Sequence, residues 1–194
     1  MNLQAKKLLT AVLLAGMGLS SVPVLAQDTG FYLGGSIGQS QFDVDTGQLS
    51  ALGATGISTD DSDSGWKIFG GYQFNKTWGL EVGYVDFGKV GIKGTAGGPF
   101  TVNLDLTAFT VAGTGTVPLA NAFSAFGKAG LYIWDSKASS SGTIVATGND
   151  GTDLMLGAGV LYNLSKNVAI QGEIEYFAGD DTVTLFSIGL RFKF

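Results

Sequence analysis

The stretch Ser187–Phe194, with the sequence SIGLRFKF, has two faces of opposite character. Successive side chains of a β-strand point to opposite faces. One face therefore carries only apolar side chains, from Ile188, Leu190, Phe192 and Phe194, while the other carries Ser187, Gly189, Arg191 and Lys193. If the charged face lies inside a barrel, the arrangement is the reverse of a soluble barrel, and the apolar face is left to meet lipid.

The same alternation recurs in further segments of the chain, each bounded by turn-forming residues. These segments lie at 31–38, 66–74, 78–84, 101–117, 123–133, 154–164 and 168–176, and the closing one runs from about Thr182 to Phe194. An even number of antiparallel strands, each about 9 to 11 residues long, is typical of an outer-membrane barrel. The sequence therefore predicts an all-β protein, namely an eight-stranded antiparallel up-and-down transmembrane β-barrel.

The connections between the segments alternate in length. Short links fall at Asn75, 118–121 and Ser165, and longer ones at 43–64, 88–99, 136–151 and 178–181. Short turns on one rim and longer loops on the other are typical of outer-membrane barrels, whose longer loops are extracellular. Within the 101–117 segment the apolar phase changes, which predicts either a bulge near Thr107 or leucines that face inward at the outer end.

The N-terminus has the three regions of a secretory signal peptide. Lys6 and Lys7 precede an apolar run at 8–19, and small residues follow up to Ala26. A membrane-anchoring helix would need about 20 apolar residues, and it would leave the small-residue cleavage pattern unexplained. We therefore expect residues 1–26 to be a signal peptide cleaved after Ala26, and residues 27–194 to form the barrel domain.

Composition excludes several classes of function. The 194 residues contain no cysteine and no histidine, which argues against a thiolate metal site, a disulfide scaffold and a Ser-His hydrolase. Loss of the leader leaves 9 basic against 16 acidic residues, a balance that argues against a nucleic-acid partner. Neither an enzyme nor a cofactor is expected. Asp60, Asp61 and Asp63 could gather a divalent ion, but they lack spaced ligands, and a solvated acidic loop is the simpler interpretation.

The charged residues of the predicted strands share the face opposite the apolar stripe. They are Lys67, Glu81, Lys128, Glu173, Glu175 and Arg191. Placing Lys or Arg on the lipid face at the bilayer midplane would cost about 2 to 4 kcal/mol each, so this face must be the inner one. Because an eight-stranded barrel has an interior that side chains just fill, we expect these residues to pair as a lumen charge network. The network is either a structural plug or the lining of a gated, narrow conduction path.

Four segments together resemble the OmpA-type eight-stranded outer-membrane barrels. They are GGYQFNKTWGLEVGYVDFG at 70–88, FGKAGLYIW at 126–134, GAGVLYNLSKNVAIQGEIEY at 157–176 and SIGLRFKF at 187–194. The resemblance implies that Phe194, with Phe192, serves as the signal read by the barrel-assembly machinery. It also matches Glu81 and Lys128 to an inward acid on the third strand and an inward base on the fifth.

The chain departs from the OmpA pattern on the seventh strand, where Glu173 stands in place of an inward arginine. Two acids would then face one another unless a base lies between them, which puts an OmpA-like gate in doubt. The chain also stops at the barrel, so wall anchoring by a peptidoglycan-binding domain is not expected.

The function indicated is that of a mainly structural or surface-exposed protein in a Gram-negative outer membrane, with a plugged lumen. Three alternatives stay open: a narrow pore for ions, water or very small solutes; a surface adhesin acting through its extracellular loops; and a soluble lipid-carrying barrel, which would place apolar residues inside. The expected surroundings are outer-membrane lipid and lipopolysaccharide, and a monomer is expected.

Overall fold

The computed structural model describes residues 29–43, 55–60, 62–95, 98–120, 122–142, 148–179 and 182–194. The predicted signal peptide and its cleavage point at Ala26 lie outside these ranges. Every regular element in the described part of the chain is a β-strand, and no helix there is long and apolar enough to cross a membrane. The strands are β1 (Gly30–Asp43), β2 (Thr55–Asp60), β3 (Ser62–Gln73), β4 (Trp78–Thr95), β5 (Pro99–Pro118), β6 (Phe123–Gly142), β7 (Asp150–Asn163), β8 (Val168–Phe177) and β9 (Thr182–Lys193).

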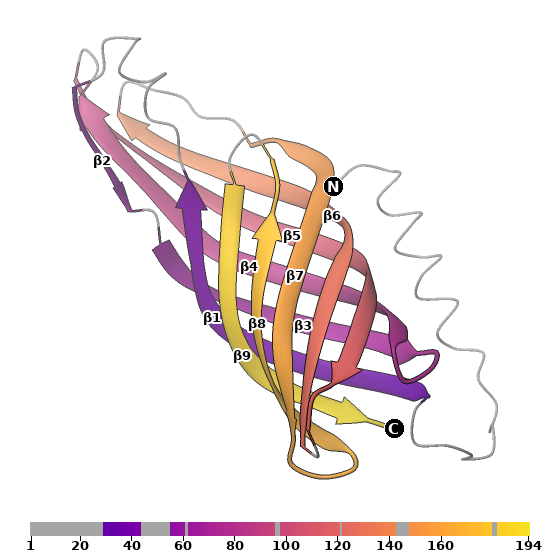
Figure 1. Cartoon of the computed structure of the whole chain (residues 1–194). Coiled ribbons are helices and arrows are strands. Elements are labelled where there is room, and N and C mark those ends of the chain that lie inside the picture. Colours follow the sequence, from indigo (N-terminus) through magenta and orange to yellow (C-terminus); the bar gives the residue numbers. More distant parts are fainter. Residues whose placement is uncertain are drawn as a thin grey trace.

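Eight of these strands close into an antiparallel barrel (Figure 1). Each of these eight strands pairs with the next one along the chain, so that β1 pairs with β3 and β4 with β5. β1 also pairs with β9, and this pairing closes the ring. Closure leaves the barrel without an unpaired edge, as a lipid environment requires. The predicted fold class is confirmed.

The strands extend further than predicted at the end opposite the short turns. β4, β5 and β6 continue through much of the regions expected to be loops, so that only residues 96–98 separate β4 from β5. β2 is an additional short strand in the first expected loop, and it pairs with the outer end of β4 from Asp60↔Gly91 to Thr55↔Thr95. Together these segments form a wall that projects beyond the rest of the barrel (Figure 1).

The expected irregularity in the 101–117 segment has a specific location. β5 pairs with β6 without interruption from Phe100 to Pro118, so the bulge near Thr107 is not in β5. The register shift lies in β4, between Asp86 and Lys89, where Gly88 adopts a φ of 81° that favours glycine. Leu104 and Leu106 face inward and pack against the buried core, as the second alternative expected.

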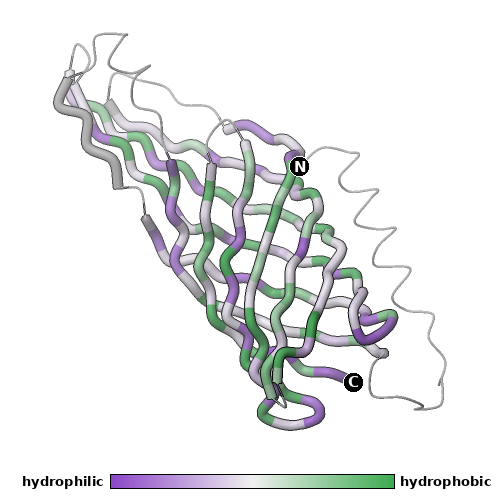
Figure 2. The backbone as a smooth tube through the Cα atoms, in the orientation of Figure 1, coloured by the Kyte–Doolittle hydropathy of each residue, from purple (hydrophilic) through white to green (hydrophobic). Residues whose placement is uncertain are grey.

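The inner and outer faces of the barrel sheet are those predicted from the alternation. Apolar side chains stay exposed on the outside, as at Leu33 (57%), Ile37 (69%) and Ile188 (60%), while Lys67 is only 1% exposed inside. Hydrophobic and hydrophilic positions alternate along parts of the strands, and longer hydrophobic stretches also occur, as along β7 (Figure 2). The closing strand follows the same rule, because Leu190 faces out and Arg191 is buried within. The apolar exterior rules out the soluble lipid-carrying alternative, which required a polar one.

The interior has two layers. Charged and polar side chains gather in the half nearer the short turns, beside a small apolar cluster of Phe126, Leu161 and Ala169, and a larger apolar core fills the half nearer the projecting wall. The apolar core contains Phe42, Val85, Phe87, Val90, Ile92, Phe100, Val102, Ala108, Ala112, Tyr132, Met155, Phe177, Val183 and Leu185. On both β4 and β8, the inward-facing side chains change from charged to apolar with distance from the short turn. The change runs from Glu81 to Phe87 on β4 and from Glu175 to Phe177 on β8.

Candidate functional site in the barrel lumen

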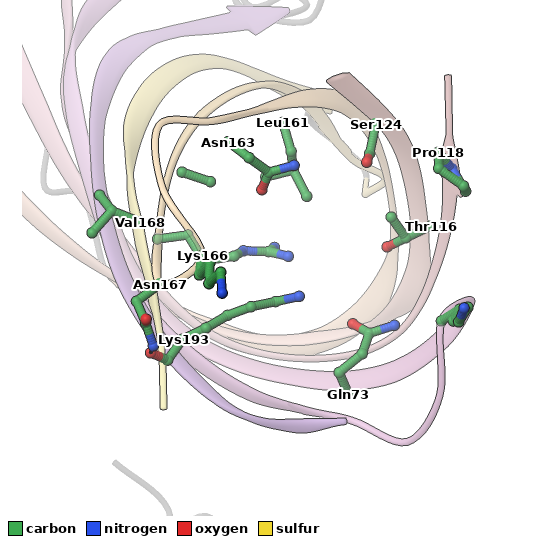
Figure 3. Close-up of a pocket in the computed structure, with 13 residues that line it drawn as sticks. Gln73, Thr116, Pro118, Ser124, Leu161, Asn163, Lys166, Asn167, Val168 and Lys193 are labelled. Atoms are coloured by element: carbon green, nitrogen blue, oxygen red, sulfur yellow. Dashed lines mark hydrogen bonds between the residues drawn. The ribbon is translucent and has the colours of Figure 1, made fainter. Parts of the chain in front are cut away.

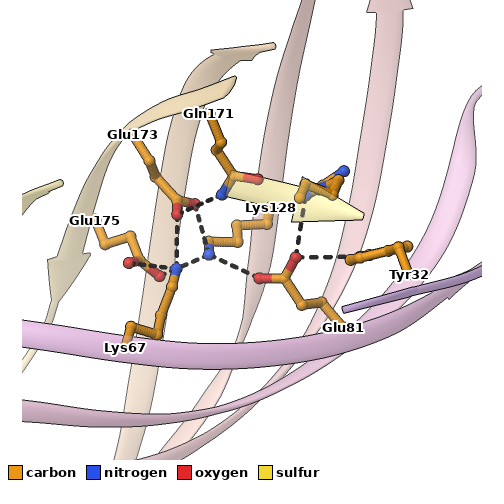
Figure 4. Close-up of polar contacts among 8 residues, drawn as sticks. Tyr32, Lys67, Glu81, Lys128, Gln171, Glu173 and Glu175 are labelled. Atoms are coloured by element: carbon orange, nitrogen blue, oxygen red, sulfur yellow. Dashed lines mark hydrogen bonds and ion pairs between the residues drawn. The ribbon is translucent and has the colours of Figure 1, made fainter. Parts of the chain in front are cut away.

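Six charged side chains from five strands converge in the lumen (Figure 4). Lys67 comes from β3, Glu81 from β4, Lys128 from β6, Glu173 and Glu175 from β8, and Arg191 from β9. Each occupies the inward phase of its strand, and none is more than 6% exposed. The structure thus brings together all six residues singled out from the sequence, with three carboxylates balanced by three cations.

Two lysines separate the glutamates of β8. The Lys67 Nζ atom lies 2.6 Å from the Glu173 Oε2 atom and 2.7 Å from the Glu175 Oε2 atom. The Lys128 Nζ atom lies 2.5 Å from the Glu173 Oε1 atom and 2.6 Å from the Glu175 Oε1 atom. The two neighbouring acids therefore share both ammonium groups, which supplies the intervening base that the glutamate at position 173 requires.

Glu81 joins this cluster to the last strand. Its Oε1 atom lies 3.0 Å from the Lys128 Nζ atom, and its Oε2 atom accepts a hydrogen bond of 3.2 Å from the Nη2 atom of Arg191. The Tyr32 hydroxyl donates to the same Oε2 atom over 3.1 Å, and the Arg191 guanidinium lies 4.2 Å from the centroid of the Tyr32 ring. Lys128 thus links the two halves of the network.

Two polar members of the network were not identified from the sequence. Tyr32 is the first, and Gln171 is the second, because its Nε2 atom donates to the Glu173 Oε2 atom over 3.0 Å. Both are almost completely buried. Gln171 had a signal in the alternation, since it shares the inward phase of β8 with Glu173 and Glu175, whereas Tyr32 shares the inward phase of β1 only with uncharged residues such as Gly34 and Ser36.

The apolar layer above the network was also missed. Phe177 packs edge-on against Phe87, with ring centroids 4.7 Å apart, and against Tyr132, at 5.1 Å. Met155 and Leu185 complete the same buried layer. A signal exists in the outer strand ends, where inward positions such as Tyr132, Met155 and Leu185 turn apolar.

The described residues do not offer a metal centre. No group of three or more carboxylate, histidine or cysteine side chains in the described ranges is placed to hold an ion. The carboxylate of Asp63 accepts hydrogen bonds from the backbone amides of Ser64 and Lys89, at 2.7 and 2.8 Å. The side chains of Asp60 and Asp61 lie outside the described residues.

Comparison with known proteins assigns the chain to a family. The model of the OmpA-like transmembrane domain matches residues 26–184. The chain belongs to this family. Outer membrane protein A of Klebsiella aerogenes is 29% identical over 202 residues, which cover 97% of this chain and 55% of that protein. Outer membrane protein A of Yersinia pseudotuberculosis is 30% identical over 204 residues, covering 97% and 56%. The chain therefore spans about half the length of the curated relatives it matches.

Solved structures share the fold of this OmpA-like chain. OprG of Pseudomonas aeruginosa superposes with a TM-score of 0.56 at 16% identity, covering 86% of this chain and 97% of OprG. Neisserial surface protein A gives a TM-score of 0.56 at 17% identity, covering 85% and 97%. Ail of Yersinia pestis gives 0.51 at 21% identity, covering 85% and 99%. The predicted family and the predicted location in a Gram-negative outer membrane are confirmed, and the short-turn end of such a barrel faces the periplasm.

Proposed function

We propose that this OmpA-like barrel is a structural, surface-exposed outer-membrane protein whose lumen is closed. The observation that carries the proposal is the pair of stacked layers, one charged and one apolar, that fill the interior. An eight-stranded barrel is just wide enough for its own side chains. Two filled layers in so narrow an interior support a closed lumen, and the proposal therefore assigns the function to the barrel wall and its projecting strands.

A passing ion would meet two different barriers. In the charged layer it would have to separate ion pairs whose N···O distances run from 2.5 to 3.2 Å. In the apolar layer it would have to lose its hydration between Phe87 and Phe177, where a charge gains nothing in return. The barriers act in series, so weakening either one alone leaves the other in place.

Planar-bilayer recording tests this proposal. The folded protein, verified by its faster gel mobility without boiling, is expected to give a flat baseline. A single variant at one layer, such as Lys128→Met or Phe177→Ala, should also stay silent, whereas a variant that combines the two should conduct. Discrete openings of the unmodified protein at neutral pH would overturn the closed-lumen proposal and favour the narrow pore.

The narrow pore has one observation in its favour, namely that Glu81 contacts two cations at once, Lys128 through one carboxylate oxygen and Arg191 through the other. Exchange between them could open a path through the charged layer. If the protein is a narrow pore, the unmodified protein already conducts. Lys128→Met, which leaves Glu81 paired with Arg191, should then give a different conductance.

A surface adhesin is supported by the projecting wall of β2, β4, β5 and β6. Replacing the hairpin residues 90–104 with a short turn removes the β4–β5 part of that wall and spares the network. Unchanged binding of cells or matrix by bacteria that display the shortened barrel would remove the adhesin from consideration.

The N-terminal and C-terminal segments carry the expected signals for export and for assembly. We propose that residues 1–26 direct secretion, that residues 27–194 form a monomeric barrel among outer-membrane lipid and lipopolysaccharide, and that Phe192 and Phe194 recruit the barrel-assembly machinery. Phe194→Ala should lower the folded yield in cells while purified protein still refolds in detergent. Phe31→Ala, another exposed aromatic at the same rim, is the matched control, and an equal loss in both variants would refute a specific signal.

A further inference from the structure

The periplasmic end of the barrel contains a cavity of about 310 Å³ (Figure 3). It lies inside the rim, between the three short turns and the inward-facing ends of β3, β5, β7 and β9. Gln73, Thr116, Ser124 and Asn163 contribute polar groups to its wall, and Arg191 lies at its inner limit, where the charged network begins. We name this cavity the periplasmic vestibule.

The charged residues that line the vestibule are all basic. They are Lys76, Lys166, Arg191 and Lys193. No carboxylate side chain is among the lining residues, and within the described residues none occurs in the short turns at 74–77, 118–120, 122–123 and 163–168. The described aspartates gather at the opposite end of the barrel, as Asp43, Asp63, Asp86, Asp105, Asp135, Asp150 and Asp153. Within the described residues, the charged side chains that line this concavity are therefore all cationic, although the protein as a whole is acidic.

Arg191, which lines the vestibule, carries a buried donor that lacks a protein partner. Only 4% of its side chain stays exposed, yet its Nε atom has no hydrogen-bond partner within the described structure. The Nη2 atom is already engaged with Glu81. A buried donor without a partner costs about 1 to 3 kcal/mol, and an anion that entered from the periplasm would meet this guanidinium as the deepest cation of the cavity.

The rim of the vestibule is held in place by its own amides. The Asn167 side chain donates to the Lys193 carbonyl over 2.8 Å, and the Asn163 side chain donates to the Ala122 carbonyl over 3.2 Å. The Gln73 side chain donates to the Asn75 carbonyl over 2.9 Å. These bonds tie the turns to the strand ends, so the basic side chains project from a fixed frame.

We propose that the periplasmic vestibule binds a phosphate-class oxyanion between its lysines and Arg191. A phosphate group carries up to two charges and several acceptor oxygens, and its hydrogen bonds to cationic donors are about twice as strong as neutral ones. A cavity of about 310 Å³ lies at the lower end of the range of ligand pockets, about 300 to 1,000 Å³. The group can come from a free phosphate compound in the periplasm or from a phospholipid headgroup of the inner leaflet.

The test exploits the fact that Arg191 is the only arginine of the sequence. Its Nε–Hε signal is therefore unique in an NMR spectrum of the folded barrel and needs no assignment. Inorganic phosphate is titrated into protein in nanodiscs of zwitterionic lipid at low salt, with chloride at matched ionic strength as the reference. A saturable shift of the arginine signal with phosphate and not with chloride is expected.

Two variants of equal net charge locate the site. Lys76→Gln with Lys166→Gln removes two cations of the vestibule, whereas Lys93→Gln with Lys137→Gln removes two exposed lysines of the projecting wall. For a dianion about 6 Å away in water-like surroundings, each vestibule lysine is worth about tenfold in affinity at low salt. We expect the first pair to weaken phosphate binding at least tenfold and the second pair to change it less than twofold.

The outcomes separate the sources of the anion. If inorganic phosphate binds as described, the site takes free phosphate. If the arginine signal moves only when the nanodiscs contain phosphatidic acid or phosphatidylglycerol, and the vestibule variant abolishes the shift, a lipid headgroup is the ligand. No shift with either probe, or equal binding by both variants, overturns the proposal. The closed-lumen function does not depend on this result.

Discussion

Lys128→Met is the sharpest perturbation of the lumen, because it removes a cation that contacts all three glutamates. The Nζ atom of Lys128 lies 3.0, 2.5 and 2.6 Å from oxygens of Glu81, Glu173 and Glu175. At an effective dielectric of about 20, unit charges about 3 Å apart attract by about 5 to 6 kcal/mol. Most of that gross attraction offsets the cost of burying the ammonium and the mutual repulsion of the glutamates.

The net effect follows from the charges that remain. Without Lys128, three carboxylates share Lys67 and Arg191, which leaves one uncompensated negative charge in the barrel. Removing one partner of a buried ion pair typically costs about 3 to 5 kcal/mol. We therefore expect the free energy of unfolding to fall by about 3 to 5 kcal/mol, measured by urea titration of the barrel in lipid vesicles with tryptophan fluorescence as the signal.

Two further variants make this prediction specific. Lys137→Met applies the same chemical change to an exposed lysine of the same strand, and it should alter stability by less than about 0.5 kcal/mol. Lys128→Met combined with Glu173→Gln restores neutrality and leaves the pairs Lys67–Glu175 and Arg191–Glu81, so much of the loss should be recovered. If Lys128→Met is as stable as Lys137→Met, or if Glu173→Gln brings no recovery, the charge-balance argument is wrong.

The remaining predictions concern packing and the lipid face. Phe177→Ala empties a fully buried position of the apolar layer and should lower the free energy of unfolding by about 3 to 5 kcal/mol in the same urea assay. Gly34→Ala would place a Cβ atom in overlap with the Phe69 ring and cost about 1 to 3 kcal/mol. The neighbouring Gly35→Ala, whose Cβ would lie an ordinary 3.5 Å from the nearest atom, should be tolerated, and equal melting of the two alanine variants would contradict the close approach. Ile188→Arg should cost about 2 to 4 kcal/mol, because the lipid face would carry a charge, and a stable variant would contradict the outward assignment of that residue.

The alternation of side chains made the faces of the barrel predictable. A one-residue error in phase would have moved Lys67 and Glu81 into lipid, so the cost of a charge there determined their orientation before any coordinates were known. Which cation meets which acid was not predictable, because those distances depend on the stagger between strands that are far apart in sequence. Lys67 and Glu175 are 108 positions apart and 2.7 Å apart in space.

The projecting wall shows where the pattern was available but misinterpreted. Val90 and Ile92 alternate with Lys89 and Lys93, a strand pattern that continues beyond Gly88. The sequence pattern predicts a long connection at residues 88–99, whereas the structure continues β4 through Gly88, whose positive φ lies at a bulge within the strand. Outside the bilayer, the length of a strand depends on hydrogen bonding to neighbouring strands such as β5 and β6. The expected length of about 9 to 11 residues per strand applies only to the part that crosses the bilayer.

The pairing of β1 with β9 has a consequence for the order in which the barrel can form. Their register runs from Tyr32↔Lys193 to Asp43↔Thr182, so the first and last barrel strands in chain order hold each other's edge. Until β9 pairs with β1, the backbone groups on that edge of β1 have no hydrogen-bond partner. An unpaired strand edge is costly in lipid and prone to aggregate in water. Stepwise insertion of one hairpin after another would therefore stall with an open edge, whereas joining the two ends of the sheet and entering the bilayer as a single event avoids the exposed intermediate.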